Sequence, residues 1–267
     1  MKKVKKIWNK SSFLILPLIF AILIAILWET KVLNSILETS QTILPTPSNI
    51  LRVLGENLNK MSSDIQTTLF EILLGLLLGS ILGYLLAVLT ALLPVVGKGG
   101  ISLITTFNAI PIIALTPVVL NLTKLGGGSV DERSFLAKVI VVTLVTMSSM
   151  SITSYRGLTE LKPFARDLLA SYAAPKHIEF FKLRLPNSIP YIFTALQIGV
   201  PTAVISALVS EYFTESTLGV GYKIKSNFTN AQFTSGWAYI FVGCFIGIVL
   251  YVLVMAIKVF VLRHRKG

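Results

Sequence analysis

Residues 66–93 read QTTLFEILLGLLLGSILGYLLAVLTALL, an apolar run that contains a single charged residue, Glu71. A stretch of about 20 such residues is long enough to cross the hydrocarbon core of a bilayer as an α-helix. Gly75, Gly79 and Gly83 recur at every fourth position, so one face of this helix forms a groove that another helix can approach closely. The stretch therefore predicts a membrane-spanning helix that packs against a neighbour.

The composition of the whole chain is that of a membrane protein. Of its 267 residues, 54% are hydrophobic and only 13% are charged, whereas soluble domains carry about 25% charged residues. The net charge of +12 lies at the ends of apolar runs and not in a stripe with interleaved aromatic residues, so we expect no nucleic-acid partner. The single cysteine, Cys244, lies in an apolar run, which excludes a disulfide framework and a thiolate metal cluster. We interpret it as a packing residue.

Five further apolar runs extend the prediction to an all-α bundle of about six transmembrane helices over residues 12–262. The runs cover residues 12–28, 101–122, 135–152, 189–213 and 237–262. No small-x-small cleavage site follows Trp28, so we interpret the first run as an uncleaved helix and not as a signal peptide. Pro111 and Pro117 break the run 101–122, which predicts that this segment faces protein or a water-filled interior.

The segment before residue 66 is mixed in polarity. Leu44-Pro45-Thr46-Pro47 predicts an extended element, and Ser48 is a candidate N-cap for a short helix over residues 49–58. The apolar residues of this helix share one face, which is typical of a helix that lies on the membrane surface. A simple connector is the alternative interpretation.

The distribution of basic residues predicts the topology. Cytoplasmic loops of membrane proteins carry an excess of Lys and Arg. Most of the 24 Lys and Arg residues fall in the N-terminal segment 1–11, the connection 155–185 and the tail 263–267. We therefore expect both termini and this connection to be cytoplasmic.

The connection contains the most informative motif, FARDLLASYAAPKHIEFFKLRLPNSIP at residues 164–190. It is amphipathic, with basic and acidic residues among helix-forming Ala and Leu, and Pro175 allows a new turn in its middle. Two interpretations remain open from the residues alone. One is a docking site for a partner protein, and the other is an interfacial helix packed on its own bundle.

This motif resembles the cytoplasmic coupling loop of binding-protein-dependent ABC permeases. The family pattern is Glu-Ala-Ala, three residues, Gly, eleven residues and Leu-Pro. The matching positions here are Asp167, Leu168, Leu169, Ala173, Leu185 and Pro186. The acid and the Leu-Pro pair agree with the pattern, whereas Leu168, Leu169 and Ala173 depart from its two alanines and its glycine.

The resemblance covers roughly residues 44–262 and is closest to permeases of the nitrate, sulfonate, taurine and thiamine-precursor type. Three further motifs carry it: Leu44-Pro45-Thr46-Pro47, Asn108-Ala109-Ile110-Pro111 and Leu218-Gly219-Val220-Gly221-Tyr222. It implies a multi-pass protein of the bacterial inner membrane that imports a small organic solute. Candidate solutes are a vitamin precursor such as hydroxymethylpyrimidine or riboflavin, or a sulfonate- or nitrate-like anion.

The resemblance also implies the partners: cytoplasmic ATP-binding subunits, an extracytoplasmic solute-binding protein, a second copy of this chain and the membrane lipid. The sequence has no Gly-x-x-x-x-Gly-Lys-Ser/Thr phosphate loop. We therefore expect ATP hydrolysis to reside in a partner subunit, and we expect this chain to be neither an enzyme nor a cofactor binder.

Polar residues within the predicted spans are candidates for the solute pathway or for hydrogen bonds between helices. They are Glu71, Asn108, Gln197 and Glu211. An ionisable residue inside a membrane is costly and is usually paired or functional. An alternative hypothesis is an ion-coupled carrier or a membrane-embedded enzyme that uses Glu71 and Glu211. No set of residues has the spacing of a catalytic or metal site.

Overall fold

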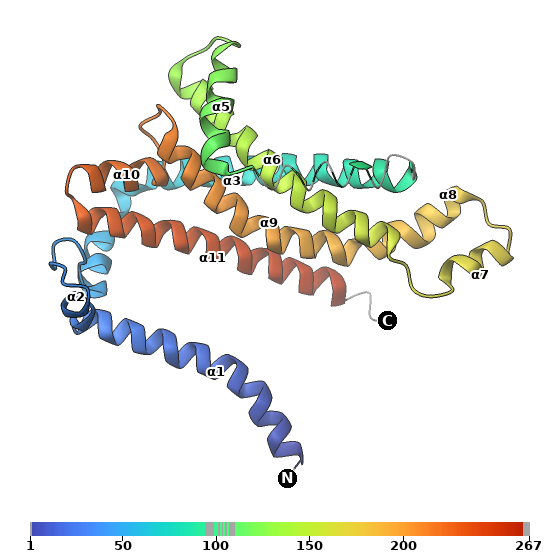
Figure 1. Ribbon diagram of the computed structural model, residues 1–267, viewed down its shortest axis with the longest axis horizontal. Coiled ribbons are helices and arrows are strands. Elements are labelled where there is room, and N and C mark those ends of the chain that lie inside the picture. The colour runs from blue at the N-terminus through green and yellow to red at the C-terminus, as the bar shows by residue number, and fades with distance from the viewer. Residues whose placement is uncertain are drawn as a thin grey trace. The chain divides into compact units, whose positions relative to one another are not determined.

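The computed structural model describes the backbone of residues 2–93, 99, 100, 102, 104, 106 and 110–263, and side chains from residue 15 onward within these ranges. All regular elements in this part of the chain are helices (Figure 1). They are α1 (Lys2–Glu29), α2 (Val32–Ile36), α3 (Pro47–Leu92), α5 (Ile112–Lys124), α6 (Val130–Thr159), α7 (Ala165–Ser171), α8 (Lys176–Ile178), the π-helical η1 (Glu179–Arg184), α9 (Leu185–Phe213), α10 (Val220–Thr229) and α11 (Phe233–Arg263).

Four helical stretches are long and apolar enough to cross a membrane: Pro47–Leu92, Val130–Thr159, Lys176–Phe213 and Phe233–Arg263. Two shorter apolar helices, Ile15–Glu29 and Ile112–Lys124, fall in the first and third predicted spans. Large apolar side chains such as Leu77, Phe245 and Phe260 are exposed on these helices, as expected where the solvent is lipid. The prediction of an all-α membrane protein is therefore confirmed.

Residues 1–61 and 224–240 form one compact unit, and residues 62–223 and 241–267 form the other. In the first unit, the indole N–H of Trp28 donates to the Pro45 carbonyl at 3.0 Å, and that of Trp237 donates to the Ile43 carbonyl at 3.0 Å. The two indole rings meet edge to face with centroids 5.4 Å apart. These contacts hold the proline-containing segment before α3.

The predicted surface helix over residues 49–58 is not a separate element. Helix α3 begins at Pro47 and runs without a break to Leu92, a length of 46 residues or about 69 Å. Ser48 lies inside its first turn and donates its hydroxyl to Glu29 at 2.6 Å, so it does not act as the predicted N-cap. The proline at Pro47 suits the first turn, where its missing N–H has no intrahelical partner.

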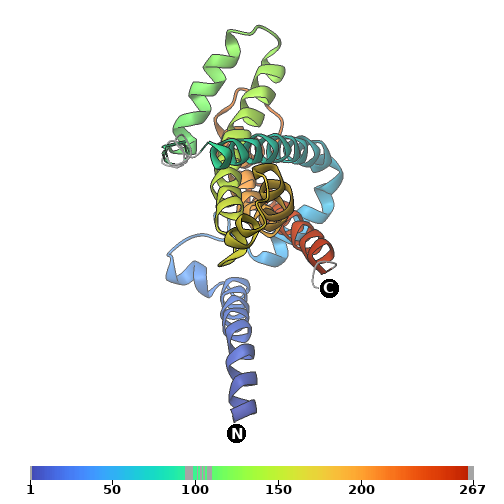
Figure 2. The same cartoon turned by 90° about the vertical axis from the view of Figure 1, so that its right-hand side faces the viewer.

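In the second unit, α6 and α9 pack side by side along much of their length, as both views show (Figures 1 and 2). Gly157 allows the close approach, because a Cβ at this position would lie 2.8 Å from the Tyr191 side chain. Helix α5 packs against both partners, and a small apolar core that includes Val119, Leu120, Ala137 and Val141 lies between α5 and α6. Cys244 is exposed, so the prediction that it is a packing residue is wrong.

Local signals explain where these helices begin. Pro111 takes an extended conformation and forms the N-cap of α5, so the broken run starts a new helix there. Ser129 and Glu132 form a reciprocal capping box at the start of α6, with hydrogen bonds of 3.3 and 2.9 Å. Helix α9 starts at Leu185, four residues earlier than the predicted span, and it continues α8 and η1 as one helical stretch from Lys176 to Phe213.

Candidate functional site

The two glutamates expected inside the membrane lie in one buried cluster within the second unit. Glu71 on α3 and Glu211 on α9 are both 0% exposed, and their carboxyl groups interact with each other. Lys138 on α6 is 1% exposed, and its ammonium group lies 2.5 Å from a Glu71 carboxylate oxygen. Three helices thus meet through charged groups that have no access to water.

Glu211 has a second set of partners at the start of α10. It accepts a hydrogen bond of 2.5 Å from the Thr68 hydroxyl and one of 2.5 Å from the Gly221 backbone N–H. Thr68 in turn accepts from the Val220 N–H at 2.9 Å, and Asp64 accepts from the Gly219 N–H at 3.2 Å. The positive end of α10 therefore faces the carboxylates and offsets part of their charge.

The glycines of the Leu218–Tyr222 motif make this contact possible. Gly219 has a φ of +112°, a conformation that side chains rarely adopt, and a Cβ there would overlap the Glu211 carboxyl group. A Cβ at Gly221 would overlap the Leu208 carbonyl oxygen. The glycine spacing thus lets the turn wrap a buried glutamate.

Sequence reasoning singled out both glutamates but missed Lys138, Thr68 and Asp64. A signal existed for Lys138, because it is a lysine inside the apolar run 135–152. A buried lysine in a membrane span is costly and requires a partner. Its partner lies 67 positions earlier in the sequence, so only the fold identifies it.

The glycine groove of α3 faces α6. Cβ atoms at Gly75, Gly79 and Gly83 would overlap or crowd Val142, Thr146 and the Met147 carbonyl, respectively. The close approach also permits hydrogen bonds between the helices. The Thr146 hydroxyl donates to the Gly75 carbonyl at 3.2 Å, and the Ser151 hydroxyl donates to the Gly83 carbonyl at 3.0 Å.

The other two polar candidates differ in outcome. Gln197 on α9 accepts a hydrogen bond of 2.6 Å from Lys258 on α11, so it links two helices. Asn108 lies outside the described residues.

An ion pair joins Lys124, at the end of α5, to Glu215, just after α9, at 2.9 Å. The hydrogen bond and charge of Lys124 lower the pKa of Glu215.

The motif at residues 164–190 forms a short helix, α7, followed by α8, η1 and the start of α9. Ala173 has a left-handed φ of +49° just after α7. Its N–H donates to the Ala170 carbonyl at 2.9 Å, and the Ala174 N–H donates to the Leu169 carbonyl at 3.0 Å. This is the Schellman geometry, in which glycine is the usual residue.

Helix α7 and its flanks present large apolar side chains to solvent. Phe164 is 81% exposed, Leu168 60%, Tyr172 78% and Phe181 62%. Asp167 is also exposed in the first turn of α7. Clustered apolar exposure with polar neighbours is typical of protein interaction surfaces. We call Phe164, Asp167, Leu168 and Tyr172 the docking face.

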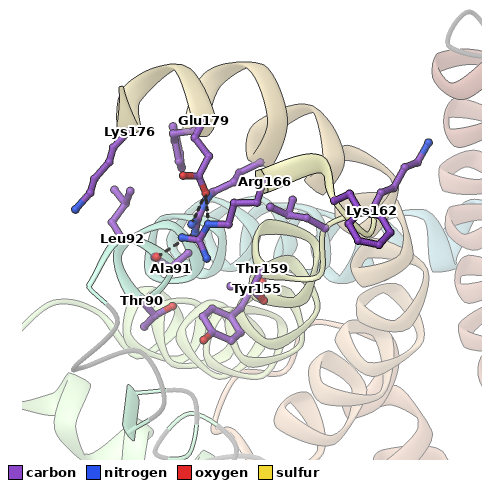
Figure 3. Close-up of a pocket in the computed structure, with 13 residues that line it drawn as sticks. Thr90, Ala91, Leu92, Tyr155, Thr159, Lys162, Arg166, Lys176 and Glu179 are labelled. Carbon is purple, nitrogen blue, oxygen red and sulfur yellow. Dashed lines mark hydrogen bonds and ion pairs between the residues drawn. The ribbon is translucent and has the colours of Figure 1, made fainter. Parts of the chain in front are cut away.

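Hydrogen bonds brace this segment against the bundle. Arg184 donates to Glu179 from two nitrogens, at 2.9 and 2.7 Å, and also donates to the Ala91 carbonyl at the end of α3, at 3.4 Å. Arg166 of α7 pairs with the same Glu179 oxygen at 3.1 Å (Figure 3). One glutamate thus joins α7 and η1, and Arg184 links them to α3.

Leu185 and Pro186 stand at the junction of this segment with α9. Pro186 lies in the first turn of α9, directly after the π-helical turn η1. The neighbouring Asn187 amide donates to the Gly157 and Glu160 carbonyls, at 2.7 and 3.1 Å. These bonds satisfy carbonyl groups at the end of α6 and fix the two ends of the connection together.

A partly open cavity of about 530 Å³ lies between α3, α5, α6 and α9. Its walls are mainly apolar, and Ser148, Ser149 and Thr202 are the hydroxyl-bearing side chains among its lining residues. Cavities of this size and composition accommodate small organic molecules. In the described ranges, no three His, Cys, Asp or Glu side chains are placed to hold a metal ion.

Comparison with known proteins gives consistent results. The family described as binding-protein-dependent transport system inner membrane component matches residues 75–266. The formylaminopyrimidine transport permease protein ThiX of Halalkalibacterium halodurans is 28% identical over 251 residues, which cover 94% of this chain and 96% of that protein. A probable ABC transporter permease protein of Haemophilus influenzae is 24% identical over 209 residues, covering 78% and 81% of the two chains.

A solved structure of an amino acid ABC transporter with histidines has a similar fold. The TM-score is 0.61 at 16% sequence identity, and the match covers 80% of this chain and 98% of that chain. At this identity, the similarity concerns the arrangement of the helices.

Proposed function

The chain belongs to the family of binding-protein-dependent transport system inner membrane components, and from that premise we propose how it couples to ATP and what it carries. It is a multi-pass inner membrane permease subunit of an ABC importer. We propose that residues 164–185 dock a separate ATPase, and that the bundle forms the solute path.

The docking face carries the proposal. Its exposed Phe164, Leu168 and Tyr172 side chains lie on a short helix that is braced on one side by Arg166 and Glu179. A partner that buries these side chains gains apolar contact area without reordering the segment, because the brace already holds it. This favours docking of a partner over packing on the chain's own bundle.

The brace also supplies a route for coupling. Arg184 connects the segment to the end of α3, and the helical stretch from Lys176 to Phe213 continues the segment into α9. Movement of a docked ATPase therefore shifts two membrane helices together. A nucleotide-dependent bias between two arrangements of the bundle is the form of coupling that we propose.

The proposed assembly has two copies of this chain, two cytoplasmic ATPases and an extracytoplasmic solute-binding protein. The basic residues of the connection 155–185 support its placement in the cytoplasm, together with both termini. ATP hydrolysis then belongs to the partner, and this chain supplies the path and the lever.

For the solute, we propose a small, neutral heteroaromatic compound related to thiamine precursors. The relative named for formylaminopyrimidine transport supports this class. The cavity between α5, α6 and α9 also suits it, because apolar walls accept a ring while Ser149 and Thr202 can pair with ring nitrogens or amino groups.

The alternative of an ion-coupled carrier draws on the buried Glu71 and Glu211. Their surroundings favour a structural role instead, because Glu71 pairs with Lys138 and Glu211 accepts from Thr68 and Gly221. Full transport by the isolated chain, without an ATPase, would establish the carrier and refute the coupled importer.

Co-purification tests the docking assignment. Leu168→Asp is expected to reduce recovery of the ATPase subunit and ATP-dependent uptake at least tenfold, because it places a charge in an apolar interface. Leu125→Asp is the matched control, since Leu125 is 85% exposed in the loop between α5 and α6. Equal ATPase recovery with both variants, at equal membrane insertion, would contradict docking on α7.

A further inference from the structure

A basic pocket lies next to the docking face. Its walls are the end of α3, the end of α6 and the segment 161–184 that follows α6. It has a volume of about 480 Å³. Its charged lining residues are Lys162, Arg166, Lys176, Glu179 and Arg184 (Figure 3). Among the described lining residues there are thus four cations and a single carboxylate.

The charges in this pocket are unequally engaged. Arg166 and Arg184 both pair with Glu179, as described above. Lys162 and Lys176 are exposed, and no ion pair to either is found in the described part of the chain. Figure 3 shows them on opposite sides of the Glu179 and Arg166 pair. The pocket therefore retains an excess of positive charge that can bind an anion.

Hydroxyl groups line another part of the same pocket. Thr90 on α3 and Tyr155 and Thr159 on α6 contribute to the wall shown in Figure 3. The Thr90 and Thr159 hydroxyls donate to carbonyls of their own helices, so Tyr155 supplies the hydroxyl that can donate to a ligand. A hydroxyl donor beside lysines and arginines suits the oxygen atoms of a phosphate group. The ligand that matches this lining is thus a phosphate-bearing anion.

The surroundings identify the source of that phosphate. The pocket wall includes Leu92, in the last turn of the apolar helix α3. The end of a membrane-spanning helix is expected near the membrane interface. Leu82, Leu85, Leu89 and Leu92 are each about half exposed, at 45%, 53%, 54% and 52%. Their spacing of three and four residues puts them on one face of α3 that leads to the pocket. This combination of a basic pocket and an apolar stripe is amphipathic, as a phospholipid is.

We propose that this pocket binds the headgroup of an anionic phospholipid, with the acyl chains along the exposed leucines of α3. Basic pockets between membrane helices are known to bind such headgroups. The site adjoins the docking face: Phe164 belongs to both, whereas Asp167, Leu168 and Tyr172 do not line the pocket. The bound lipid would brace the segment that the proposed ATPase contacts, so ATP-driven transport would depend on lipid charge.

The test compares two double variants that remove the same charge. Lys162→Gln/Lys176→Gln removes the two positive charges of the pocket that have no ion-pair partner among the described residues. Arg156→Gln/Lys182→Gln is the control, because Arg156 and Lys182 are exposed in the same region but do not line the pocket. Binding of phosphatidylglycerol to the purified full chain is measured by native mass spectrometry, with phosphatidylcholine as the uncharged reference.

The pocket variant should bind phosphatidylglycerol roughly 10- to 30-fold more weakly, since each lysine near an anionic lipid contributes roughly a fivefold factor. The control should bind within twofold of the wild type. If the pocket double variant does not fold, Lys176→Gln alone should weaken binding roughly fivefold by the same reasoning. Equal phosphatidylglycerol binding by pocket and control variants would overturn the proposal.

Two further arms separate the alternatives. Displacement of phosphatidylglycerol by millimolar inorganic phosphate would overturn the lipid assignment in favour of a free anion. Loss of ATPase binding with unchanged lipid binding would overturn it in favour of a protein interface. The lipid measurement uses the chain without its ATPase, so a failure of the proposed coupling would leave this result intact.

Discussion

Lys138 is the residue on which the interior of the second unit depends most directly. Its side chain is 1% exposed, and its ammonium group lies 2.5 Å from the carboxylate of Glu71, which is also buried. A buried charge is tolerated only with such a partner, because desolvation costs several kcal/mol per ion in a protein. The pair therefore fixes the register of α3 against α6.

Lys138→Met should lower the stability of the chain by about 3–5 kcal/mol, because it leaves Glu71 buried without its cation. Thermal unfolding in detergent measures the change. Lys124→Met is the control, since its partner Glu215 is exposed and surface ion pairs contribute little. The double variant Glu71→Leu/Lys138→Met should recover much of the loss. Equal melting temperatures for the two single variants would contradict a buried pair.

Ala173 adopts a strained backbone conformation and therefore destabilises its turn. Its φ of +49° in the Schellman turn after α7 is a conformation that costs a non-glycine residue about 1–2 kcal/mol. Ala173→Gly should therefore stabilise α7 by up to about 1 kcal/mol after the entropy of glycine is included. Ala173→Val should destabilise it.

Hydrogen exchange of the α7 amides measures both changes at Ala173. The control is Ala170→Gly, which puts the glycine inside α7 and should accelerate exchange. Slower exchange in Ala173→Val than in Ala173→Gly would show that the turn does not adopt this geometry.

At the scale of elements, α3 packs closely on α6 because three glycines of α3 have no side chain at the contact. The groove at Gly75, Gly79 and Gly83 leaves room for Val142, Thr146 and backbone carbonyls of α6. The four-residue spacing indicated a packing face but not which helix fills it. Only the fold shows that α6 occupies the groove, with Thr146 and Ser151 donating to α3 carbonyls.

Gly79→Ala should destabilise the bundle by about 1–3 kcal/mol, because the new Cβ would overlap the Thr146 hydroxyl and force the helices apart. Gly55→Ala is a control in the same helix, as a Cβ there meets nothing within 4 Å. That change should be neutral or slightly stabilising. The melting temperature and the yield of monodisperse protein test both. A neutral Gly79→Ala would rule out the tight contact.

For the whole molecule, residue patterns predicted where the helices lie in the sequence but not which helices contact each other. Apolar runs located the membrane helices because hydrocarbon selects for them at every position. The prediction that a short helix ends at residue 58 was wrong, because α3 continues to Leu92. Mixed polarity does not end a helix when helix propensity and tertiary contacts sustain it. Glu71 and Glu211 were identified by their cost in a membrane, whereas Lys138 needed the pairing of distant segments.

The topology of the whole molecule gives the last prediction. The 30-residue helix α6 is about 45 Å long, so its two ends lie on opposite sides of the bilayer. Lys162, Arg166 and Lys176 follow its C-terminal end, and the positive-inside rule predicts that this end is cytoplasmic.

Two introduced cysteines can read this orientation. In a Cys244→Ser background, a membrane-impermeant maleimide should label Leu125→Cys in intact cells but label Leu168→Cys only after permeabilisation. Both positions are well exposed, at 85% and 60%, so access to the reagent and not burial decides the result. Labelling of Leu168→Cys in intact cells would reverse the topology and separate the docking face from any cytoplasmic ATPase.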